Sequence, residues 1–286
     1  MKATRVLIGI PTLNGPDRLN RLLFSLRHHT DWTKFASVKL LVCDDGSREK
    51  AFEENRSVCA QYPDLVEKAR LEYIAHHARR GIAAGWNTLC RHGHAEWDVA
   101  ILLNDDVEVV RHWLETVVYS LVENPVLGMV GLNAYLSVTK GQVDTLHPAA
   151  LEHVRNLQID YHEAALLTAG GTLLASHGSA FGFRRDVYDK VGGFDERYFC
   201  FYEELDFGVA CKGHGLIHAM LSYPIIYHMG GATNSIPSNL DARARMNESR
   251  VKFEQKWLAT ASELRRRIEP RAELLREWNT QIENWP

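Results

Sequence analysis

Several features are scarce or absent in this sequence of 286 residues, and each absence narrows the class of protein. No run of apolar residues approaches bilayer length, so we expect no membrane-spanning segment. The five cysteines are scattered and lack CxxC spacing, which indicates neither a disulfide framework nor a zinc site. A net charge of -3 gives no basic surplus for nucleic acid or an acidic membrane. The first residues also lack the apolar core of a signal peptide, and we expect a cytoplasmic protein.

What is present fits an ordinary globular protein, with 45% hydrophobic and 24% charged residues. Short apolar runs that are typical of strands alternate with helical patterns along the first half of the chain. The strand-like runs cover residues 5–10, 38–43, 70–75, 99–103 and 128–132. Such alternation is typical of βαβ units. We therefore predict an α/β fold with a doubly wound, mostly parallel sheet.

The second half of the chain is less regular. Between about residues 133 and 167 the sequence is polar and weakly periodic, and no element is assigned there. Beyond residue 239 the chain is highly charged and has a helical pattern, broken at Pro270. We expect a main domain over residues 1–239, in two halves that divide at residue 132, and a peripheral C-terminal helical extension over residues 240–286.

The stretch from Val99 to Val110 organises the rest of the sequence. Its apolar run reads as a strand buried on both faces, and it ends in Asn104, Asp105 and Asp106. Adjacent carboxylates repel each other unless a positive charge lies near them, and oxygen ligands of this kind favour Mg²⁺ or Mn²⁺. Open α/β sheets bind ligands at the carboxyl ends of their strands. The alternative is an Asp-rich turn.

Two further acidic pairs also allow two interpretations. Asp44 and Asp45 end a neighbouring strand, where they either face a ligand or form a plain Asp-Gly turn. Glu203 and Glu204 begin a short helix after an aromatic stretch. They either deprotonate a hydroxyl group or stabilise the helix dipole. His228 follows a late strand and precedes two glycines, which would let the backbone approach a ligand closely.

Six motifs occur in an order that matches a known family. They are Ile10-Pro11-Thr12-Leu13-Asn14, Val42-Cys43-Asp44-Asp45-Gly46-Ser47, the segment from Gly81 to Asn87, Asn104-Asp105-Asp106, the block Gly192-Gly193-Phe194-Asp195-Glu196 with Glu203-Glu204-Leu205-Asp206, and His228-Met229-Gly230-Gly231-Ala232-Thr233. Each motif alone is weak, but the ordered set over roughly residues 5 to 257 resembles a family-2 glycosyltransferase with the GT-A fold. The last motif is similar to bacterial rhamnosyl- and galactofuranosyl-transferase relatives.

The resemblance implies that the N-terminal half binds a nucleotide-diphospho-sugar. Pro11, Thr12 and Asn14 belong to the motif that shapes the nucleotide pocket, and either Asp44 or Asp45 reads a pyrimidine base. The remaining donor-side residues that we predict are Arg80, with Arg79 as the alternative, and Gly81, Asn87, Asn104 and Asp105. Many family members have Asp where this chain has Asn104, whose amide would ligate a metal poorly.

The resemblance also implies the catalytic and metal-binding residues. Asp106 and His228 would hold Mn²⁺ or Mg²⁺, because carboxylates can hold a diphosphate only through a cation. Glu204 would be the base for an acceptor hydroxyl, with Glu203 beside it. The family usually has Glu-Asp here, so Glu204 is one methylene longer.

These observations predict an inverting, metal-dependent glycosyltransferase that uses a UDP- or dTDP-type donor. The acceptor would be a hydroxyl of a glycan or a lipid-linked molecule, in glycan or cell-envelope polysaccharide synthesis. Peripheral association with the inner membrane face and a homo-oligomer through the C-terminal helices are further expectations. One alternative is a sugar-nucleotide pyrophosphorylase, whose Gly-rich basic loop is missing at Pro11 to Pro16. The other is a non-catalytic sugar- or nucleotide-binding protein on the same fold.

Overall fold

The computed structural model describes residues 3–63, 65, 69–136, 159–161, 178–229 and 239–257. Three segments lie outside these residues: most of the irregular stretch between residues 133 and 167, Gly230 to Thr233 of the last motif, and the tail beyond Trp257. The elements are β1 (Arg5–Thr12), α1 (Pro16–His29), η1 (Trp32–Lys34), β2 (Ser37–Asp44), α2 (Glu49–Ala60), β3 (Ala69–Ala75), α3 (Ile82–His92), η2 (His94–Glu96), β4 (Val99–Leu103), β5 (Val107–Val109), α4 (Trp113–Glu123), β6 (Leu127–Leu136), β7 (Ile159–Tyr161), β8 (Ala180–Arg184), α6 (Arg185–Val191), α7 (Glu203–Gly213), β9 (Ile217–His228) and α8 (Asn239–Trp257).

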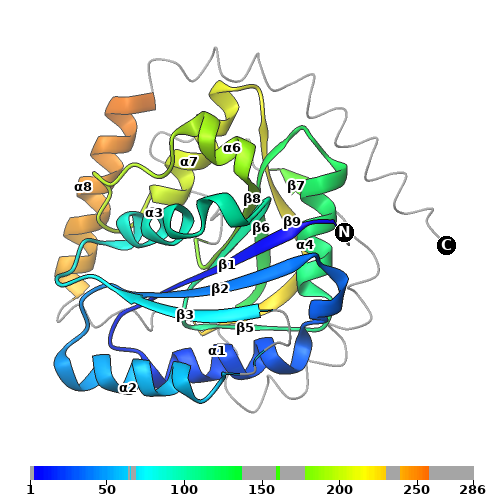
Figure 1. Cartoon of the computed structure of the whole chain (residues 1–286). Coiled ribbons are helices and arrows are strands. Elements are labelled where there is room, and N and C mark those ends of the chain that lie inside the picture. Colours follow the sequence, from blue (N-terminus) through cyan, green and yellow to red (C-terminus); the bar gives the residue numbers. More distant parts are fainter. Residues whose placement is uncertain are drawn as a thin grey trace.

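The described strands form one nine-stranded sheet, in the order β3-β2-β1-β4-β8-β6-β9-β5, with β7 on β9 (Figure 1). The strands β1 to β4 pair in parallel, as the alternating pattern predicted. The strand β8 is antiparallel to both β4 and β6, whereas β6 and β9 pair in parallel. The α/β, mostly parallel architecture is therefore confirmed, with β5, β7 and β8 as the strands that run in the opposite direction.

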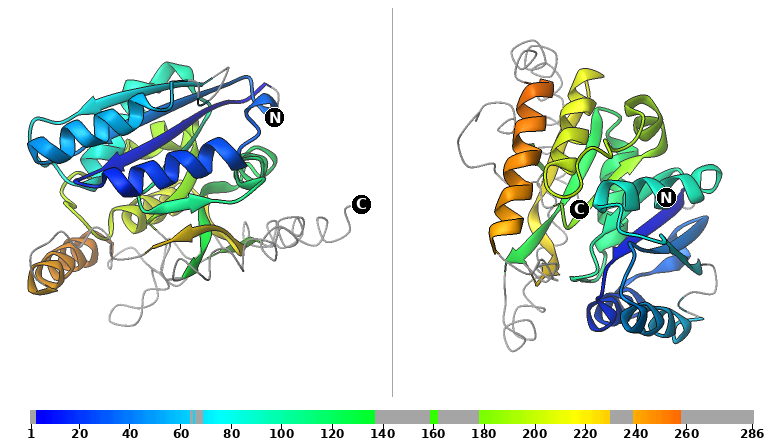
Figure 2. Two further views of the ribbon diagram at one scale, coloured as in Figure 1. Left: turned by 90° about the horizontal axis from the view of Figure 1, so that it is seen from below. Right: turned by 90° about the vertical axis from the view of Figure 1, so that its left-hand side faces the viewer.

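Helices cover both faces of the sheet, which explains why the central strands are apolar on both sides. One buried cluster joins the sheet to α1 and α4, through side chains such as Leu22 and Trp113. The second joins the other face to α3, α6 and α7, through Trp86, Val187 and Phe207. Figure 2 shows α1 and α2 on one side of the strands and α3, α6 and α7 on the other.

The helix α8 packs against α7 and the loop before it. Phe253 of α8 is 7% exposed and lies in a third buried cluster with Tyr198, Tyr202, Leu205 and Val209. This part of the predicted extension is helical, and its contacts join it to the sheet domain. Figure 2 shows α8 beside α7 at one side of the molecule.

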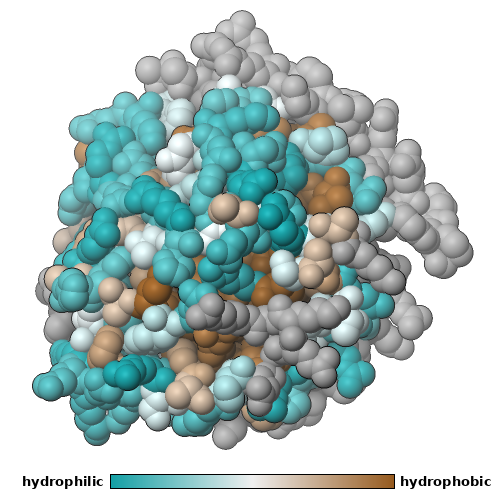
Figure 3. All heavy atoms as spheres, viewed as in Figure 1, coloured by the Kyte–Doolittle hydropathy of each residue, from teal (hydrophilic) through white to brown (hydrophobic). Residues whose placement is uncertain are grey.

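The outer surface is mainly hydrophilic on the face drawn in Figure 3, where hydrophobic residues appear in separate patches. The large hydrophobic side chains that are exposed in the described residues are Phe24, Val122, Met246 and Val251. Within the described residues, no helix is both long enough and apolar enough to cross a bilayer.

Candidate active site

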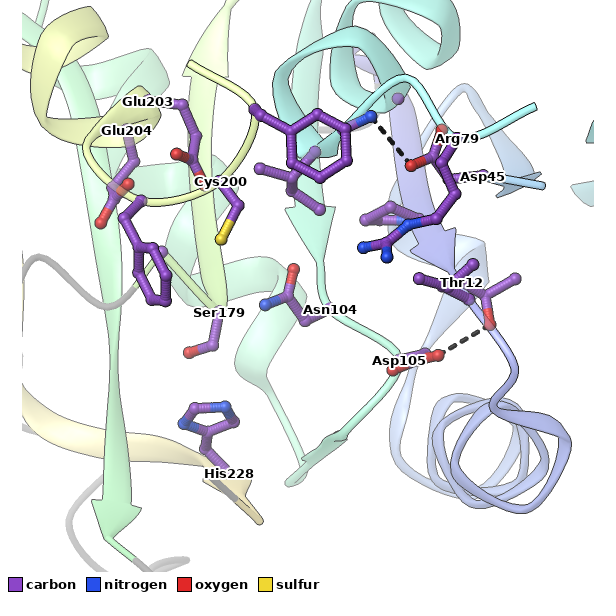
Figure 4. Close-up of a pocket in the computed structure, with 18 residues that line it drawn as sticks. Thr12, Asp45, Arg79, Asn104, Asp105, Ser179, Cys200, Glu203, Glu204 and His228 are labelled. Atoms are coloured by element: carbon purple, nitrogen blue, oxygen red, sulfur yellow. Dashed lines mark hydrogen bonds between the residues drawn. The ribbon is translucent and has the colours of Figure 1, made fainter. Parts of the chain in front are cut away.

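A pocket of about 340 Å³ opens where the loops after β1, β2 and β4 meet the loops before α3 and α7. Its lining comprises Pro11, Thr12, Leu13, Asp45, Arg79, Gly81, Ile82, Gly85, Asn104, Asp105, Gly178, Ser179, Phe199, Cys200, Phe201, Glu203, Glu204 and His228. In Figure 4 the two glutamates lie on one side of the pocket, and Asp45 and Thr12 lie on the other, with Asn104 between them. The carboxyl end of the sheet thus gathers residues from all six motifs.

Asp105 is buried and its charge is compensated within the protein. Thr12 Oγ1 donates a hydrogen bond of 2.7 Å to its Oδ2. Arg18 donates from Nε at 3.0 Å to Oδ1 and from Nη2 at 3.2 Å to Oδ2. Burial is the largest influence on the pKa of Asp105 and keeps it above its ordinary value, although the hydrogen bonds from Arg18 and Thr12 oppose the rise. Asp105 therefore fixes the chain after β4 to the end of β1 and to the start of α1.

Asp106 and His228 lie next to each other because β5 pairs with β9. The register places Val107 opposite His228, and Met229 N donates to the Asp106 carbonyl at 3.1 Å. His228 Nε2 lies 3.4 Å from Asp106 Oδ1, which is buried and has no hydrogen-bond partner among the described residues. The two residues that we predicted as metal ligands are thus brought together.

Buried polar atoms without a described hydrogen-bond partner gather at this pocket. Besides Asp106 Oδ1, they include Asn104 Oδ1, Ser179 Oγ and Glu203 Oε2. A buried polar atom without a partner costs about 1–3 kcal/mol, so such atoms are uncommon unless a ligand, ion or water satisfies them. Their concentration in one cavity indicates a polar ligand site.

Of the two aspartates at the end of β2, only Asp45 lines the pocket. Its Oδ1 accepts from Arg80 N and lies 2.9 Å from His76 Nδ1, and its Oδ2 accepts from Gly81 N at 2.9 Å. Asp44 is fully buried, where it accepts hydrogen bonds from Ser47 N, Asn55 Nδ2 and Tyr73 Oη. Asp45 Oδ2 can therefore accept a further hydrogen bond from a ligand. The carboxylate of Asp44, in contrast, is used in hydrogen bonds within the fold.

The segment before α3 points Arg79, and not Arg80, into the pocket (Figure 4). The Arg80 side chain extends to Glu196, with Nη2 at 3.0 Å from Oε2. Gly81 has φ +92, and a Cβ there would collide with the backbone of Phe199, so glycine is required on both counts. This close approach brings the loop that contains Phe199 against the start of α3.

Asn14 and Asn87, two other predicted donor-side residues, make hydrogen bonds inside the protein. Asn14 adopts φ 50 and accepts from Arg48 N at 2.8 Å, which ties together the loops after β1 and β2. Asn87 is fully buried, and it donates to Phe194 O and accepts from Phe194 N. Neither residue lines the pocket, so both act on the site through the loops that they hold.

Glu203 and Glu204 begin α7 after two residues in left-handed backbone conformations, Phe201 (φ 69) and Tyr202 (φ 72). Such backbone is strained for bulky residues and tends to be kept at functional sites. Burial raises the pKa of Glu203 well above its ordinary value, and the charge of Glu204 raises it further. Burial raises the pKa of Glu204 to about 7. Burial therefore favours the protonated form of both glutamates, as it does for Asp105, but only Asp105 has Arg18 to oppose this effect.

The Glu204 side chain packs against a glycine in the loop before β8. A Cβ added at Gly178 would lie 2.8 Å from the Glu204 carboxyl carbon, so a side chain at this position would displace the carboxylate. The neighbouring Ser179 accepts a hydrogen bond of 2.7 Å at its backbone oxygen from Asn104 N. Together these two residues connect the acidic end of β4 to the start of α7.

Sequence reasoning missed several residues that line the pocket or support its lining. Arg18 lies at the start of α1, where the helical spacing of its leucines gives no signal of a buried ion pair. Gly178 and Ser179 precede β8 without a recognisable motif. Phe199 and Phe201, from the aromatic stretch before Glu203, also line the pocket.

The side chains of Asp106 and His228 are suitable ligands for a hard divalent cation. The described residues contain no group of three or more His, Cys, Asp and Glu side chains that could hold a metal. Mg²⁺-type sites, however, are commonly built from one or two protein ligands completed by substrate phosphates and water. The unpartnered Oδ1 of Asp106, with His228 Nε2 beside it, supplies such a partial site.

Comparisons with known proteins agree with this geometry. A mannosyltransferase from Pyrobaculum calidifontis, solved with GDP-Man and Mn²⁺, has a TM-score of 0.56 at 17% identity, over 98% of this chain and 84% of that chain. GalNAc-T7, solved with UDP, GalNAc and Mn²⁺, has a TM-score of 0.56 at 13% identity, over 79% and 44%. TarS residues 1–349 from S. aureus, solved with UDP, has a TM-score of 0.54 at 13% identity, over 78% and 60%.

At such low identities these likenesses show the fold, and the chain spans only 36% of the longer TarS structure. None of the curated proteins matches the sequence. The model of the family described as glycosyl transferase family 2 matches residues 7–192, which is more than half of the chain and contains the Asp105 and Asp45 strand ends. The chain therefore belongs to glycosyl transferase family 2 and has the GT-A fold.

Proposed function

We propose that this glycosyltransferase moves a sugar from a nucleotide-diphospho-sugar, of the UDP or dTDP type, to an acceptor hydroxyl with inversion of configuration and with a divalent cation. The observation that carries the proposal is the opposition of two acidic pairs in one pocket. Asp105 and Asp106 follow β4, with Asp105 in the pocket lining and Asp106 next to it, and Glu203 and Glu204 begin α7 and line the opposite side. The first pair suits the donor's diphosphate, and the second suits a proton transfer.

Glu204 is our candidate for the base. A hydroxyl becomes a competent nucleophile when a positioned base takes its proton as the new bond forms. With a pKa of about 7, Glu204 is substantially ionised at neutral pH and still binds the transferred proton well. The acceptor oxygen bonds to the anomeric carbon while the bond from that carbon to the diphosphate breaks, and attack from the opposite face inverts the centre. Burial and the charge of Glu204 both favour the protonated form of Glu203, which limits the negative charge beside the base.

Asp106 and His228 are our candidates for holding the cation, which we propose to be Mn²⁺ or Mg²⁺. Asn104 offers its unpartnered amide oxygen to the donor, and Asp105 keeps the end of β4 in place. When bound, the cation would neutralise charge on the departing diphosphate. The nucleotide would lie toward Asp45, whose Oδ2 can accept one hydrogen bond from the base or ribose.

Three related structures support the donor and cation. The mannosyltransferase and GalNAc-T7 were solved with Mn²⁺ together with GDP-Man or UDP and GalNAc, and TarS was solved with UDP. For this chain we infer the same class of donor, and an acceptor hydroxyl on a glycan or lipid-linked molecule of cell-envelope type. Such an enzyme would work in the cytoplasm or at the inner membrane face.

Calorimetric titration with UDP and with dTDP tests the donor and the cation. Each nucleotide is titrated with Mn²⁺ and then with a chelator, and we expect binding that is at least tenfold weaker without the metal. Asp106→Ala should remove most of this metal dependence, and His228→Ala should weaken it. Asp189→Ala is the matched control, because Asp189 is an exposed carboxylate that pairs with His94 away from the pocket. Equal affinity with and without metal would contradict the cation assignment, and NMR of the product anomer tests inversion.

A further inference from the structure

The aromatic ring of Phe199 makes cation–π contacts with two arginines from distant parts of the chain. The Arg79 guanidinium carbon lies 5.3 Å from the ring centroid, and the Arg245 guanidinium carbon lies 4.5 Å from it. Phe199 and Arg79 both line the pocket, whereas Arg245 belongs to α8. Cation–π contacts at these distances hold a guanidinium in place but leave its N–H groups free to donate elsewhere.

The two positive charges are poorly compensated. In the described part of the chain, neither arginine has a carboxylate within ion-pair distance. Glu248, three residues after Arg245, accepts from Lys252 Nζ at 2.7 Å, and both Lys252 and Arg245 lower its pKa. The nearby Cys200 thiol has a pKa of about 12, raised by burial and by Glu203, while Arg245 and Arg79 lower it. One side of the pocket therefore has a pair of like charges that a bound anion would stabilise.

The packing of α8 fixes the position of Arg245. Ser249, one helical turn later, donates from Oγ to Cys200 O at 2.9 Å, and Lys252 Nζ donates to Arg197 O at 2.8 Å. Near the end of the helix, Lys256 Nζ lies 2.8 Å from Asp206 Oδ2, and Trp257 Nε1 donates to Asp206 Oδ1 at 2.7 Å. These contacts repeat along one face of α8, the face that meets the loop and helix that contain Phe199 and Glu204.

We propose that Arg245, together with Arg79 on the Phe199 ring, binds a phosphate group of the ligand, so that α8 is part of the active site. Planar guanidinium groups match phosphate oxygens in geometry and charge better than ammonium groups do. The inference rests on the proposed function in so far as the phosphate belongs to a substrate. It comes either from the diphosphate of the donor or from a phosphate on the acceptor.

The test compares wild type with Arg245→Gln and Arg245→Lys, using UDP, uridine and inorganic pyrophosphate as calorimetric probes in Mn²⁺ buffer. Arg250→Gln is the control, since Arg250 lies on the same helix but pairs with Glu254 at 2.7 Å. If Arg245 binds the donor's diphosphate, Arg245→Gln should weaken UDP by about tenfold, as expected for a charge-assisted hydrogen bond, and leave uridine unchanged. Arg245→Lys should recover part of the affinity, and Arg250→Gln should behave as wild type.

A different pattern would identify the acceptor as the source of the phosphate. In that case UDP affinity is unchanged in Arg245→Gln, while pyrophosphate binding to the UDP-loaded protein is lost. If neither UDP nor pyrophosphate binding changes, the inference is overturned. If wild type binds no UDP at all, the proposed donor class fails, but loss of pyrophosphate binding in Arg245→Gln alone would still support the arginine site. Circular dichroism of each variant checks that α8 remains folded.

Discussion

Asp105–Asp106 and Glu203–Glu204 line or adjoin the same pocket, yet their surroundings differ. Asp105 receives three hydrogen bonds from Arg18 and Thr12, and Asp106 has His228 beside it. Glu203 is 6% exposed, and Oε2 of its carboxyl group has no hydrogen-bond partner among the described residues. The first pair thus has basic side chains beside it, whereas burial raises the pKa of both glutamates of the second pair. Residue type alone therefore does not assign a role, because the groups that surround each carboxylate set its protonation.

The largest expected effect comes from removing the proton acceptor. Glu204→Gln keeps the size of the side chain but cannot take a proton, so transfer should fall by a factor on the order of 10² to 10⁴. Nucleotide affinity should stay near the wild-type value, because Glu204 faces the acceptor. Steady-state transfer rates and calorimetry measure the two quantities. Glu203→Gln serves as the control and should be milder; full turnover of Glu204→Gln would contradict the mechanism.

A second prediction removes the compensation of the aspartate pair. Arg18→Met leaves Asp105 buried with only Thr12 as partner, and an uncompensated buried carboxylate should lower the free energy of unfolding by about 2–4 kcal/mol. Adding Asp105→Asn should restore most of that loss, because the neutral amide needs no cation. Urea unfolding of the single and double variants measures the recovery.

Arg27→Met is the matched control for that series, since Arg27 is an exposed residue of the same helix. It should change the free energy of unfolding by less than about 0.5 kcal/mol. If Arg18→Met were as stable as this control, Asp105 would not depend on the ion pair, and the contrast between the two acidic pairs would lose its basis.

The order of strands and helices could be predicted from sequence, as could the strand ends that carry the aspartates, because both follow from local periodicity and turn residues. The pairing of β5 with β9 could not be predicted from sequence. β5 has three residues, Val107–Val109, and it brings Asp106 beside a histidine more than a hundred positions later. Such contacts depend on the tertiary register, which the local pattern around Asp106 does not contain.

The sequence also could not show which of two adjacent residues faces the pocket. Asp44 and Asp45 are both strand-end acids, and only the hydrogen bonds of Ser47, Asn55 and Tyr73 show that Asp44 is committed to the fold. Arg79 and Arg80 differ in direction because Asp45 accepts from the backbone of Arg80 and Gly81. In both cases adjacent side chains point in different directions, and hydrogen bonds to other parts of the chain determine which of the two lines the pocket.

The smallest expected effect is a gain in stability at the proton-binding pair. An unfolded Glu203 ionises near pH 4.3, whereas its pKa in the folded protein is raised by burial. Between these values the folded state binds more protons than the unfolded state, so stability falls as pH rises through this window. Glu203→Gln removes the free-energy cost of ionising a buried carboxyl group. At pH 8 the variant should be more stable than wild type, and it should unfold at a higher urea concentration.

The difference should shrink as the pH is lowered toward about 4, where Glu203 is protonated in both states and Gln is a close mimic. Urea unfolding at pH 5, 6, 7 and 8 follows this trend, with Glu123→Gln on the exposed end of α4 as the control that should show no trend of this kind. A Glu203→Gln variant that is less stable than wild type at pH 8 would mean that the folded state stabilises the charged form. The two acidic pairs would then be alike, and the assignment of Glu204 as a base with a raised pKa would lose its electrostatic support.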